Sequence, residues 1–133
     1  GASYKYALWG GLMSIRAKQL KAAGAVLNGF SRDTNQILEL NFPTFSMGTY
    51  AQDQGPRGKV IDYGVSIEWD GIRINPGDIV FGDRDGVLII PKEVEEEAFV
   101  KAMEKASGEN RVLQALRDEG MSSVEAFNKF GIM

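Results

Sequence analysis

The first apolar positions of the chain recur at spacings close to the helical period. Between Tyr6 and Ala23, apolar residues alternate with lysines in this way, which predicts a helix over that range. Gly10 and Gly11 would each cost about 1 kcal/mol inside a helix, so we expect them in its first turn. Their backbone N–H groups could hold an anion there, and a close-packing contact explains two glycines equally well. Gly24 is expected to end the helix.

Two shorter apolar runs follow, with a helical stretch between them. Ala25–Leu27 and Thr44–Met47 predict buried strands. Asp33 or Thr34 is a suitable N-cap for a helix that runs to about Leu40 and is broken by the residues after it. The order helix, strand, helix, strand is typical of a parallel α/β unit.

The middle of the chain has a different pattern. Residues 47–59 are rich in Gly, Gln, Asp and Pro and predict a long loop. Short apolar runs separated by turn residues then predict strands at Val60–Tyr63, Val65–Trp69, Ile72–Ile74, Asp78–Phe81 and Val87–Ile90. Asp70-Gly71 is a strong hairpin signal, so we interpret this part as a mostly antiparallel β meander.

The C-terminal part predicts helices. Residues 92–118 form a long charged helix with an apolar face of Val94, Ala98, Val100, Ala102, Met103, Val112, Leu113 and Leu116. We expect residues 106–108 to interrupt or kink it and Gly120 to end it. Ser122 or Ser123 is expected to cap a final short helix. The apolar side chains expected to face inward on that helix are Val124, Phe127 and Phe130.

Composition restricts the chemistry that the chain can perform. It has 133 residues, enough for one modest domain, and a net charge of −3, which does not suggest nucleic-acid binding. Cysteine is absent, which excludes disulfides, zinc–thiolate sites and thiol nucleophiles. Histidine is absent as well, which excludes Ser-His-Asp triads and histidine ligands. A metal would be held by oxygen atoms, which favours Mg²⁺ or Mn²⁺.

Neither a membrane segment nor a targeting signal is visible in the sequence. No apolar run approaches the roughly 20 residues of a spanning helix, and no basic-then-apolar signal peptide opens the chain. Together with the absence of cysteine, this predicts a cytoplasmic protein with neither a membrane nor a nucleic acid as its partner.

The candidate site lies where the stretch Ala23–Asp33 ends. Arg32 and Asp33 stand side by side after an apolar strand, and open α/β folds bind ligands at the carboxyl ends of their strands. A cation and a carboxylate there could serve an anionic substrate and a hard metal ion together. The pattern alone is also typical of a strand-end turn with an Arg-Asp surface pair.

Three ordered segments resemble one known family. They are Gly10–Asp33, the run Phe42-Pro43-Thr44-Phe45-Ser46-Met47-Gly48-Thr49, and the run from Asn75 through Asp83-Arg84-Asp85-Gly86 to Val87. These segments are similar to the RraA-like family, and Met121–Met133 resembles the tail of one subgroup. The family includes 4-hydroxy-4-methyl-2-oxoglutarate/4-carboxy-4-hydroxy-2-oxoadipate aldolases and RraA regulators of ribonuclease E. Some members were formerly misnamed demethylmenaquinone methyltransferases.

The resemblance implies a layered α/β sandwich with a parallel α/β part, a β meander and C-terminal helices. It implies a single RraA-like domain over residues 1–133 that lacks the family's N-terminal segment, and assembly into homotrimers or homohexamers with sites between subunits. It also implies a divalent metal, Mg²⁺ or Mn²⁺, and a small keto-acid substrate of the pyruvate type.

The resemblance assigns roles to individual residues. The aldolases carry an acidic residue, twenty intervening residues and then Arg-Asp, and Arg32-Asp33 match the last two positions. Arg32 would bind the keto acid and neutralise the enolate, and Asp33 would anchor the metal. Gly11 stands at the acidic position, which removes one carboxylate from the site. Glu109 falls where the aldolases bring in a glutamate from the neighbouring subunit.

Three hypotheses of function follow from these residues. The first is a metal-dependent, class II-type pyruvate aldolase, a carbon–carbon lyase that releases pyruvate from 4-hydroxy-2-oxo acids and could decarboxylate oxaloacetate. Arg32 would supply a fixed cation, and the backbone amides of Gly10, Gly11 and Leu12 could hold the substrate carboxylate. The second is a non-catalytic regulator that binds a ribonuclease, as RraA does. A third is an inactive relative kept for assembly.

Overall fold

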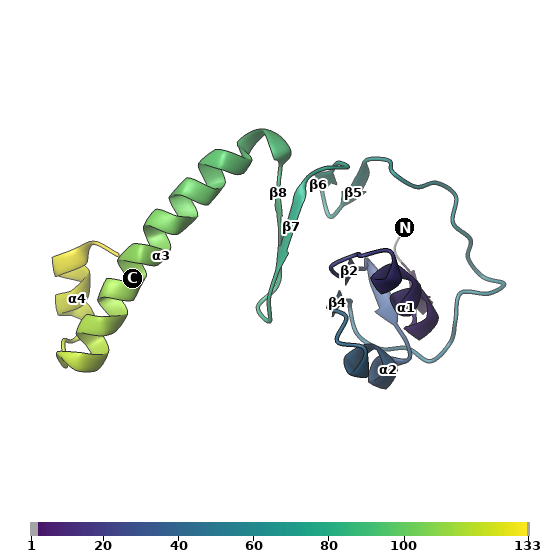
Figure 1. Cartoon of the computed structure of the whole chain (residues 1–133), viewed down its shortest axis with the longest axis horizontal. Coiled ribbons are helices and arrows are strands. Elements are labelled where there is room, and N and C mark those ends of the chain that lie inside the picture. The colour runs from purple at the N-terminus through teal and green to yellow at the C-terminus, as the bar shows by residue number, and fades with distance from the viewer. Residues whose placement is uncertain (1–2, 133) are drawn as a thin grey trace. The chain divides into compact units, whose positions relative to one another are not determined.

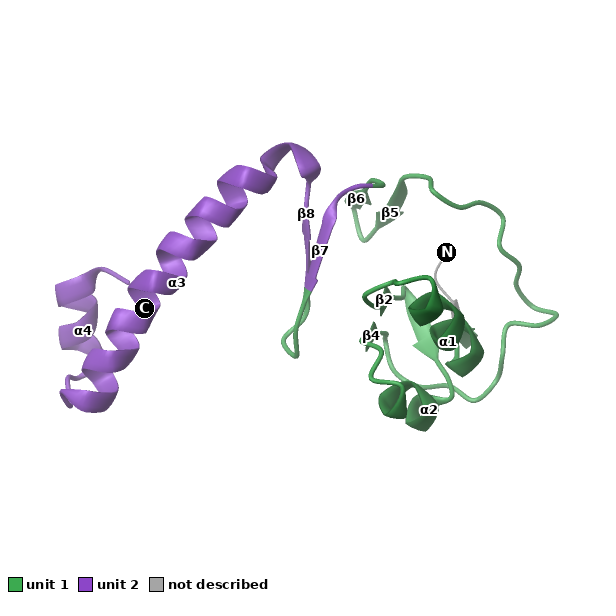
Figure 2. Ribbon diagram, viewed as in Figure 1, with its two compact units in different colours: residues 1–76, 82–87 green, residues 77–81, 88–133 purple. Residues whose placement is uncertain are grey.

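The computed structural model describes residues 3–132 and contains both helices and strands, which confirms the predicted α/β class (Figure 1). The strands are β1 (Ser3–Trp9), β2 (Ala25–Val26), β3 (Gly29–Ser31), β4 (Thr44–Phe45), β5 (Ile67–Trp69), β6 (Ile72–Ile74), β7 (Ile79–Gly82) and β8 (Val87–Ile90). The helices are α1 (Gly11–Gln19), α2 (Thr34–Glu39), the 3-10 turn η1 (Lys92–Val94), α3 (Glu95–Asp118) and α4 (Ser123–Phe130). The chain forms two compact units, one of residues 1–76 and 82–87 and the other of residues 77–81 and 88–133 (Figure 2).

Parallel strand pairs organise the first unit. β1 pairs with β3, with Trp9 opposite Ser31, and β2 pairs with β4, with Val26 opposite Phe45. The strand β1 was not predicted, because the helix was expected to begin at Tyr6. That prediction was wrong: residues up to Trp9 are rich in aromatic side chains, which favour strands, and their pairing with β3 outweighs a helical spacing of leucines.

Helix α1 begins where the two glycines predicted it. Gly10 is its N-cap and Gly11 its first residue. Its end was predicted too late, because the helix stops at Gln19 and Lys21 adopts a left-handed conformation with φ of 65°. Gly24 serves close packing instead of ending the helix, since a Cβ atom there would lie 2.7 Å from the carbonyl oxygen of Pro43.

The strand β3 and the helix α2 complete this part of the unit. Gly29 opens the strand β3, which was not predicted and which ends directly before Arg32. The predicted helix after Asp33 is confirmed as α2, and the strand predicted at Thr44–Met47 is confirmed as the shorter β4. The buried apolar residues of this unit are Ala7, Ile37 and Phe42.

The predicted meander consists of two separate two-stranded sheets, β5–β6 and β7–β8. The hairpin turn at Asp70-Gly71 is confirmed, since both residues have positive φ angles, of 50° and 78°. The turn at residues 83–86 is present too, and the Asp83 carboxylate accepts the backbone N–H groups of Asp85 and Gly86. The strand predicted at Val60–Tyr63 was wrong: this segment lies exposed without a neighbouring strand to pair with, and the loop continues to residue 66.

The second unit is dominated by α3, which runs without interruption through residues 106–108. The kink predicted there was wrong, and Gly108 instead gives the side chain of Ile132 room to approach the helix. Gly120 ends α3 with φ of 65°, as predicted. Of the residues predicted as its apolar face, Val112 is buried, whereas Val100, Met103 and Leu113 are among those exposed.

Helix α4 is capped by Ser122, one of the two predicted caps. Ser122 and Glu125 form a reciprocal capping box. The inward orientation predicted for Val124 and Phe127 was wrong: both side chains are exposed, and the buried residue of the helix is Ala126. Within residues 3–132, no helix combines the length and the apolar character needed to cross a membrane.

Candidate active site

Strand β3 leads directly into Arg32 and Asp33. The backbone N–H of Arg32 donates to the carbonyl oxygen of Trp9 over 2.9 Å, so Arg32 extends the pairing of β1 and β3. Asp33 is the N-cap of α2 and has a left-handed backbone, with φ of 57°. Its side chain makes no capping bond to its own helix. The carboxylate is therefore available to another partner, and aspartate is one of the residues that tolerate a left-handed backbone.

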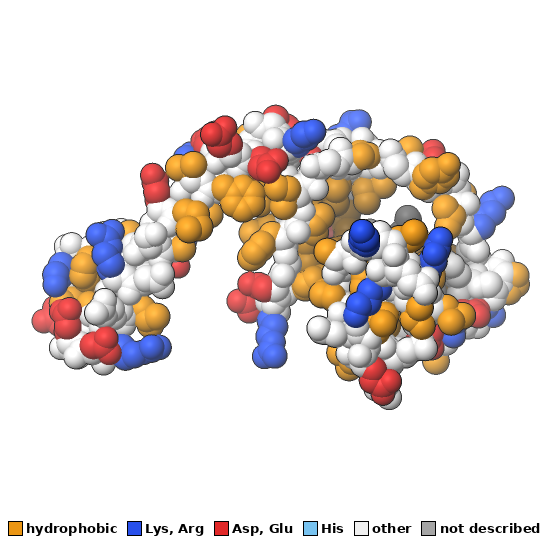
Figure 3. Space-filling model, viewed as in Figure 1, with side chains coloured by type: hydrophobic (Ala, Val, Ile, Leu, Met, Phe, Trp, Pro, Cys, Tyr) orange, Lys and Arg blue, Asp and Glu red, His pale blue; other side chains and the backbone are white. Residues whose placement is uncertain are grey.

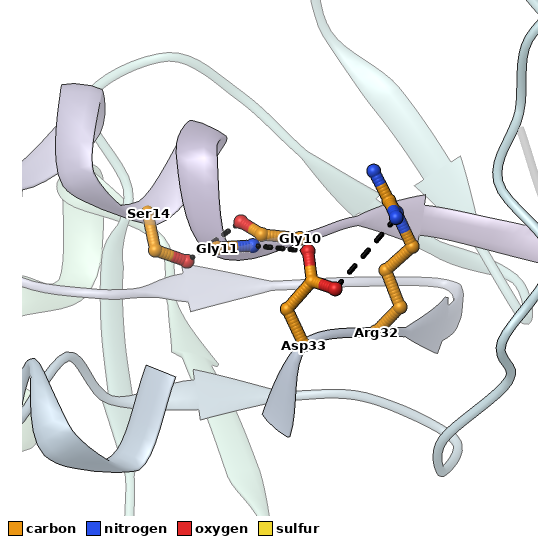
Figure 4. Close-up of polar contacts among 5 residues, drawn as sticks. All are labelled: Gly10, Gly11, Ser14, Arg32 and Asp33. Atoms are coloured by element: carbon orange, nitrogen blue, oxygen red, sulfur yellow. Dashed lines mark hydrogen bonds and ion pairs between the residues drawn. The ribbon is translucent and has the colours of Figure 1, made fainter. Parts of the chain in front are cut away.

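The partner is the first turn of α1. Asp33 Oδ2 accepts the backbone N–H of Gly11 over 3.0 Å, and Asp33 Oδ1 lies 3.6 Å from Nη1 of Arg32 (Figure 4). The two side chains are 38% and 34% exposed, so both reach solvent. The guanidinium and the carboxylate thus face each other in one partly exposed place, beside the positive end of a helix.

The two glycines leave the space that this arrangement requires. A Cβ atom on Gly10 would lie 2.8 Å from Asp33 Oδ2 and 3.2 Å from Cγ of Arg32. Gly10 is extended, with φ of −158°, so the constraint is room and not backbone conformation. The structure therefore brings together Gly10, Gly11, Arg32 and Asp33 of the predicted set.

Leu12 is the second residue of α1 and follows Gly11. The first helical hydrogen bond of α1 runs from the Ser14 N–H to the Gly10 carbonyl, so the Leu12 N–H precedes the helical ladder. The Leu12 side chain is 76% exposed.

Gln36 was missed by the sequence reasoning. A Cβ atom on Gly11 would overlap the side-chain amide of Gln36, so Gln36 fills the place that a side chain at position 11 would take. A signal was available, because Gln36 lies three residues after Asp33, and residues at that spacing share a helix face. Ser14 and Trp9, which hold the first turn of α1 through hydrogen bonds, were missed as well.

The oxygen atoms at this site suit a hard divalent cation held through water and substrate. Over residues 3–132, no cluster of three or more acidic side chains forms a complete metal cage. Mg²⁺ usually keeps several waters and takes one or two protein carboxylates plus substrate oxygens, so the single Asp33 carboxylate is compatible with such an ion.

Glu109 lies in α3, in the other unit. Its carboxylate is 3.5 Å from Nζ of Lys105, a helix-surface ion pair with a half-exposed glutamate. Its predicted role, as a ligand contributed to a neighbouring subunit, stays a prediction.

A cavity of about 260 Å³ lies beside α2. Its lining includes Ser31, Ile37, Phe42 and Ser46, and neither Arg32 nor Asp33. Hydroxyl groups and apolar side chains line it, without a charged group. The Arg32–Asp33 site is instead an open surface position.

Comparison with known proteins places this chain in one family. The family model "RraA-like: Aldolase/RraA" matches residues 1–89, so the chain belongs to the RraA-like family. A protein of Halalkalibacterium halodurans named "Putative 4-hydroxy-4-methyl-2-oxoglutarate aldolase" is 38% identical over 106 residues, covering 80% of this chain and 50% of that protein. The predicted family membership is confirmed.

Solved structures give the same result for the fold. An uncharacterized protein from Pseudomonas syringae pv. tomato matches with a TM-score of 0.91 and 26% identity, over 96% of this chain and 60% of that one. The RNA-processing inhibitor RraA from Thermus thermophilis matches with a TM-score of 0.58 and 29% identity, over 65% of this chain and 52% of that one. The chain thus spans about half the length of the curated relatives and solved structures that it matches.

Proposed function

We propose that this chain carries the site of a divalent-metal-dependent carbon–carbon lyase that cleaves 4-hydroxy-2-oxo acids to pyruvate. The observation that supports this most directly is the position of Arg32 and Asp33, whose side chains face each other beside the first turn of α1. The similarity to a protein named as an aldolase supports the reaction class. Decarboxylation of oxaloacetate would use the same site, because it produces the same pyruvate enolate.

Each residue has a task in this proposal. In retro-aldol cleavage, a solvent water takes the proton of the 4-hydroxyl, and the C4 oxygen becomes the carbonyl of the departing product as the bond between C3 and C4 breaks. The electron pair of that bond forms the pyruvate enolate, which is then protonated at C3. The Arg32 guanidinium binds the keto acid and offsets the enolate charge. The substrate carboxylate is bound by the N–H groups of the first turn of α1 that are not used by Asp33, which already accepts the Gly11 N–H. Asp33 would hold Mg²⁺ or Mn²⁺, which supplies Lewis-acid stabilisation of the keto oxygen when bound.

The proposed site is completed by a second copy of the chain. Figure 3 shows hydrophobic side chains on the surface, and α3 and α4 expose Phe99, Val100, Met103, Leu113, Val124 and Phe127. An apolar surface of this kind favours association, so we expect a homotrimer or homohexamer. In that assembly, Glu109 would reach the metal of a neighbouring subunit.

The test is pyruvate release from 4-hydroxy-4-methyl-2-oxoglutarate in the presence of Mg²⁺ or Mn²⁺, followed with lactate dehydrogenase. Arg32→Ala should reduce the rate at least ~100-fold, because the fixed cation opposite the enolate is lost. Arg84→Ala is the matched control, since Arg84 also precedes an aspartate but lies in the exposed turn at residues 83–86. Release no faster than a metal-only blank would reject the lyase.

A second candidate function is a non-catalytic regulator of ribonuclease activity. Two observations favour it: Gly11 removes a carboxylate from the site, and the Thermus thermophilis structure is named as an RNA-processing inhibitor. Recovery of a ribonuclease in a pulldown, with loss of ribonuclease activity on adding the chain and without metal-dependent pyruvate release, would support this alternative. A chain that does neither is an inactive relative kept for assembly.

A further inference from the structure

Ser14 is the one polar side chain within residues 3–132 that is completely buried, at 0% exposure. Its Oγ atom accepts the Nε1–H of Trp9 over 2.6 Å and donates to the carbonyl oxygen of Gly10 over 3.1 Å. An indole N–H can only donate, so the hydroxyl must accept there. Its single proton is then available to the Gly10 carbonyl, which fixes the direction of the hydroxyl.

The carbonyl that Ser14 holds belongs to the peptide bond between Gly10 and Gly11. The backbone N–H of Ser14 donates to the same oxygen over 3.0 Å, so two donors hold it. In a planar trans peptide, the C=O and the N–H point in opposite directions. Fixing the Gly10 carbonyl therefore fixes the Gly11 N–H, which donates to Asp33 Oδ2 on the other side (Figure 4).

We propose that Ser14 is a positioning residue for the Asp33 carboxylate and acts through the peptide bond between Gly10 and Gly11. The proposal rests on the function proposed above, because it assigns Ser14 a part in preparing Asp33 for the metal. Hydrogen bonds to the carbonyl also polarise the amide and strengthen the bond that its N–H makes to Asp33.

The hydroxyl is anchored in the core of its unit through Trp9. The indole ring stacks on Phe42, with ring centroids 6.4 Å apart and planes 10° apart, and Phe42 is buried. The direction of the Gly11 N–H is thus set by packed aromatic side chains and not by solvent.

A serine hydroxyl that bonds the carbonyl four residues earlier is common in helices. Ser107 makes such a bond in α3, to the carbonyl of Met103 over 2.8 Å, but it is exposed. Ser14 differs because it is buried, has Trp9 as a second partner, and holds a peptide whose N–H contacts Asp33. Ser107→Ala is therefore a matched control for Ser14→Ala.

The experiment compares the full chain with its Ser14→Ala, Ser14→Thr and Ser107→Ala variants. The readouts are the Mn²⁺ dissociation constant from calorimetry and the exchange rate of the Gly11 amide proton from NMR. For Ser14→Ala we expect Mn²⁺ binding to weaken ~10-fold and Gly11 exchange to accelerate ~10-fold or more. Ser14→Thr, which keeps the hydroxyl, should restore both values to within about twofold, and Ser107→Ala should change neither.

Unchanged Gly11 exchange and unchanged Mn²⁺ binding in Ser14→Ala would overturn the proposal. If that variant does not fold, Ser14→Cys keeps the volume with a weak donor and should show the same losses, and its failure to do so overturns the proposal equally. Failure of the lyase function gives a different result: the wild-type chain then releases no pyruvate or binds no Mn²⁺. In that case Gly11 exchange still decides whether Ser14 positions the peptide.

Discussion

The side-chain amide of Gln36 occupies the place that a side chain on Gly11 would take. The family resemblance implies an acid at position 11 in the aldolases, and in this chain Gln36 fills the space that such a side chain would need. Gln36 brings an amide oxygen and no charge. The structure thus explains how the first turn of α1 stays closely packed against α2 without the acid.

The coupling of these two residues gives the first prediction. Gly11→Asp alone should lower the free energy of unfolding by about 1–3 kcal/mol, because the new side chain must displace Gln36. In a Gln36→Ala background the same change should cost less than about 1 kcal/mol, since space is free and an acid suits a helix N-terminus. Urea unfolding of the wild type, the two single variants and the double variant gives the interaction energy between the two positions. If the effects of the two substitutions simply add, a side chain at position 11 does not collide with Gln36.

Gly10 gives a second prediction. Gly10→Ala should leave the backbone unstrained, since φ is −158°, but its Cβ would push on Asp33 Oδ2 from 2.8 Å. We expect at least ~10-fold weaker Mn²⁺ binding, because a metal ligand is moved from its place. Gly86→Ala is the control, as a Cβ there meets no atom within 4 Å. Equal Mn²⁺ affinity in both variants would show that the Asp33 position does not depend on Gly10.

The closeness of Arg32, Asp33 and the two glycines could be expected from the sequence, because they lie at the end of a strand and the start of a helix. The strand β1 could not, since its residues gain from pairing with β3, a partner more than twenty positions away in the chain. Helical spacing is a local signal, and here tertiary pairing outweighs it.

Glycine roles were also hard to assign without the fold. Gly24 and Gly108 were interpreted as a helix end and a helix interruption, and both instead accommodate a close neighbour: Pro43 at Gly24 and Ile132 at Gly108. Whether a glycine serves conformation or space depends on what lies opposite its Cα atom, which the sequence does not state. The contacts among Ser14, Trp9 and Gly10 were missed for the same reason.

The contact of Gly108 with Ile132 gives a third prediction. The effect of Gly108→Ala on the free energy of unfolding should change sign when the Ile132 side chain is removed. Gly108→Ala should gain nothing or destabilise the chain, because its Cβ meets the Ile132 side chain. In an Ile132→Ala background, the same change should stabilise the protein by about 1 kcal/mol, the usual difference in helix propensity between alanine and glycine. Unfolding midpoints in urea measure both changes. An equal gain in both backgrounds would mean that the Ile132 contact is not formed in solution.

The capping box of α4 gives a prediction on pH. Hydrogen bonds from the Ser122 side chain and backbone lower the pKa of the Glu125 carboxyl from its ordinary value of 4.5. A lowered pKa in the folded state means that the charged carboxylate stabilises α4 above the pKa of the unfolded chain. This stabilisation begins to be lost as the pH falls below 4.5, and it is fully lost once the pH has fallen through the lower pKa of Glu125 in the folded state.

Glu125→Gln tests this directly. Glutamine can still accept the Ser122 N–H but does not titrate in this range, so the variant should lose less stability than the wild type between pH 5 and about pH 3. Glu104→Gln is the control, because Glu104 is exposed in α3 and outside any cap. Urea unfolding at several pH values, with circular dichroism as the signal, measures the difference. If wild type and Glu125→Gln fall in parallel over this range, the Glu125 carboxylate does not hold the Ser122 amide in solution.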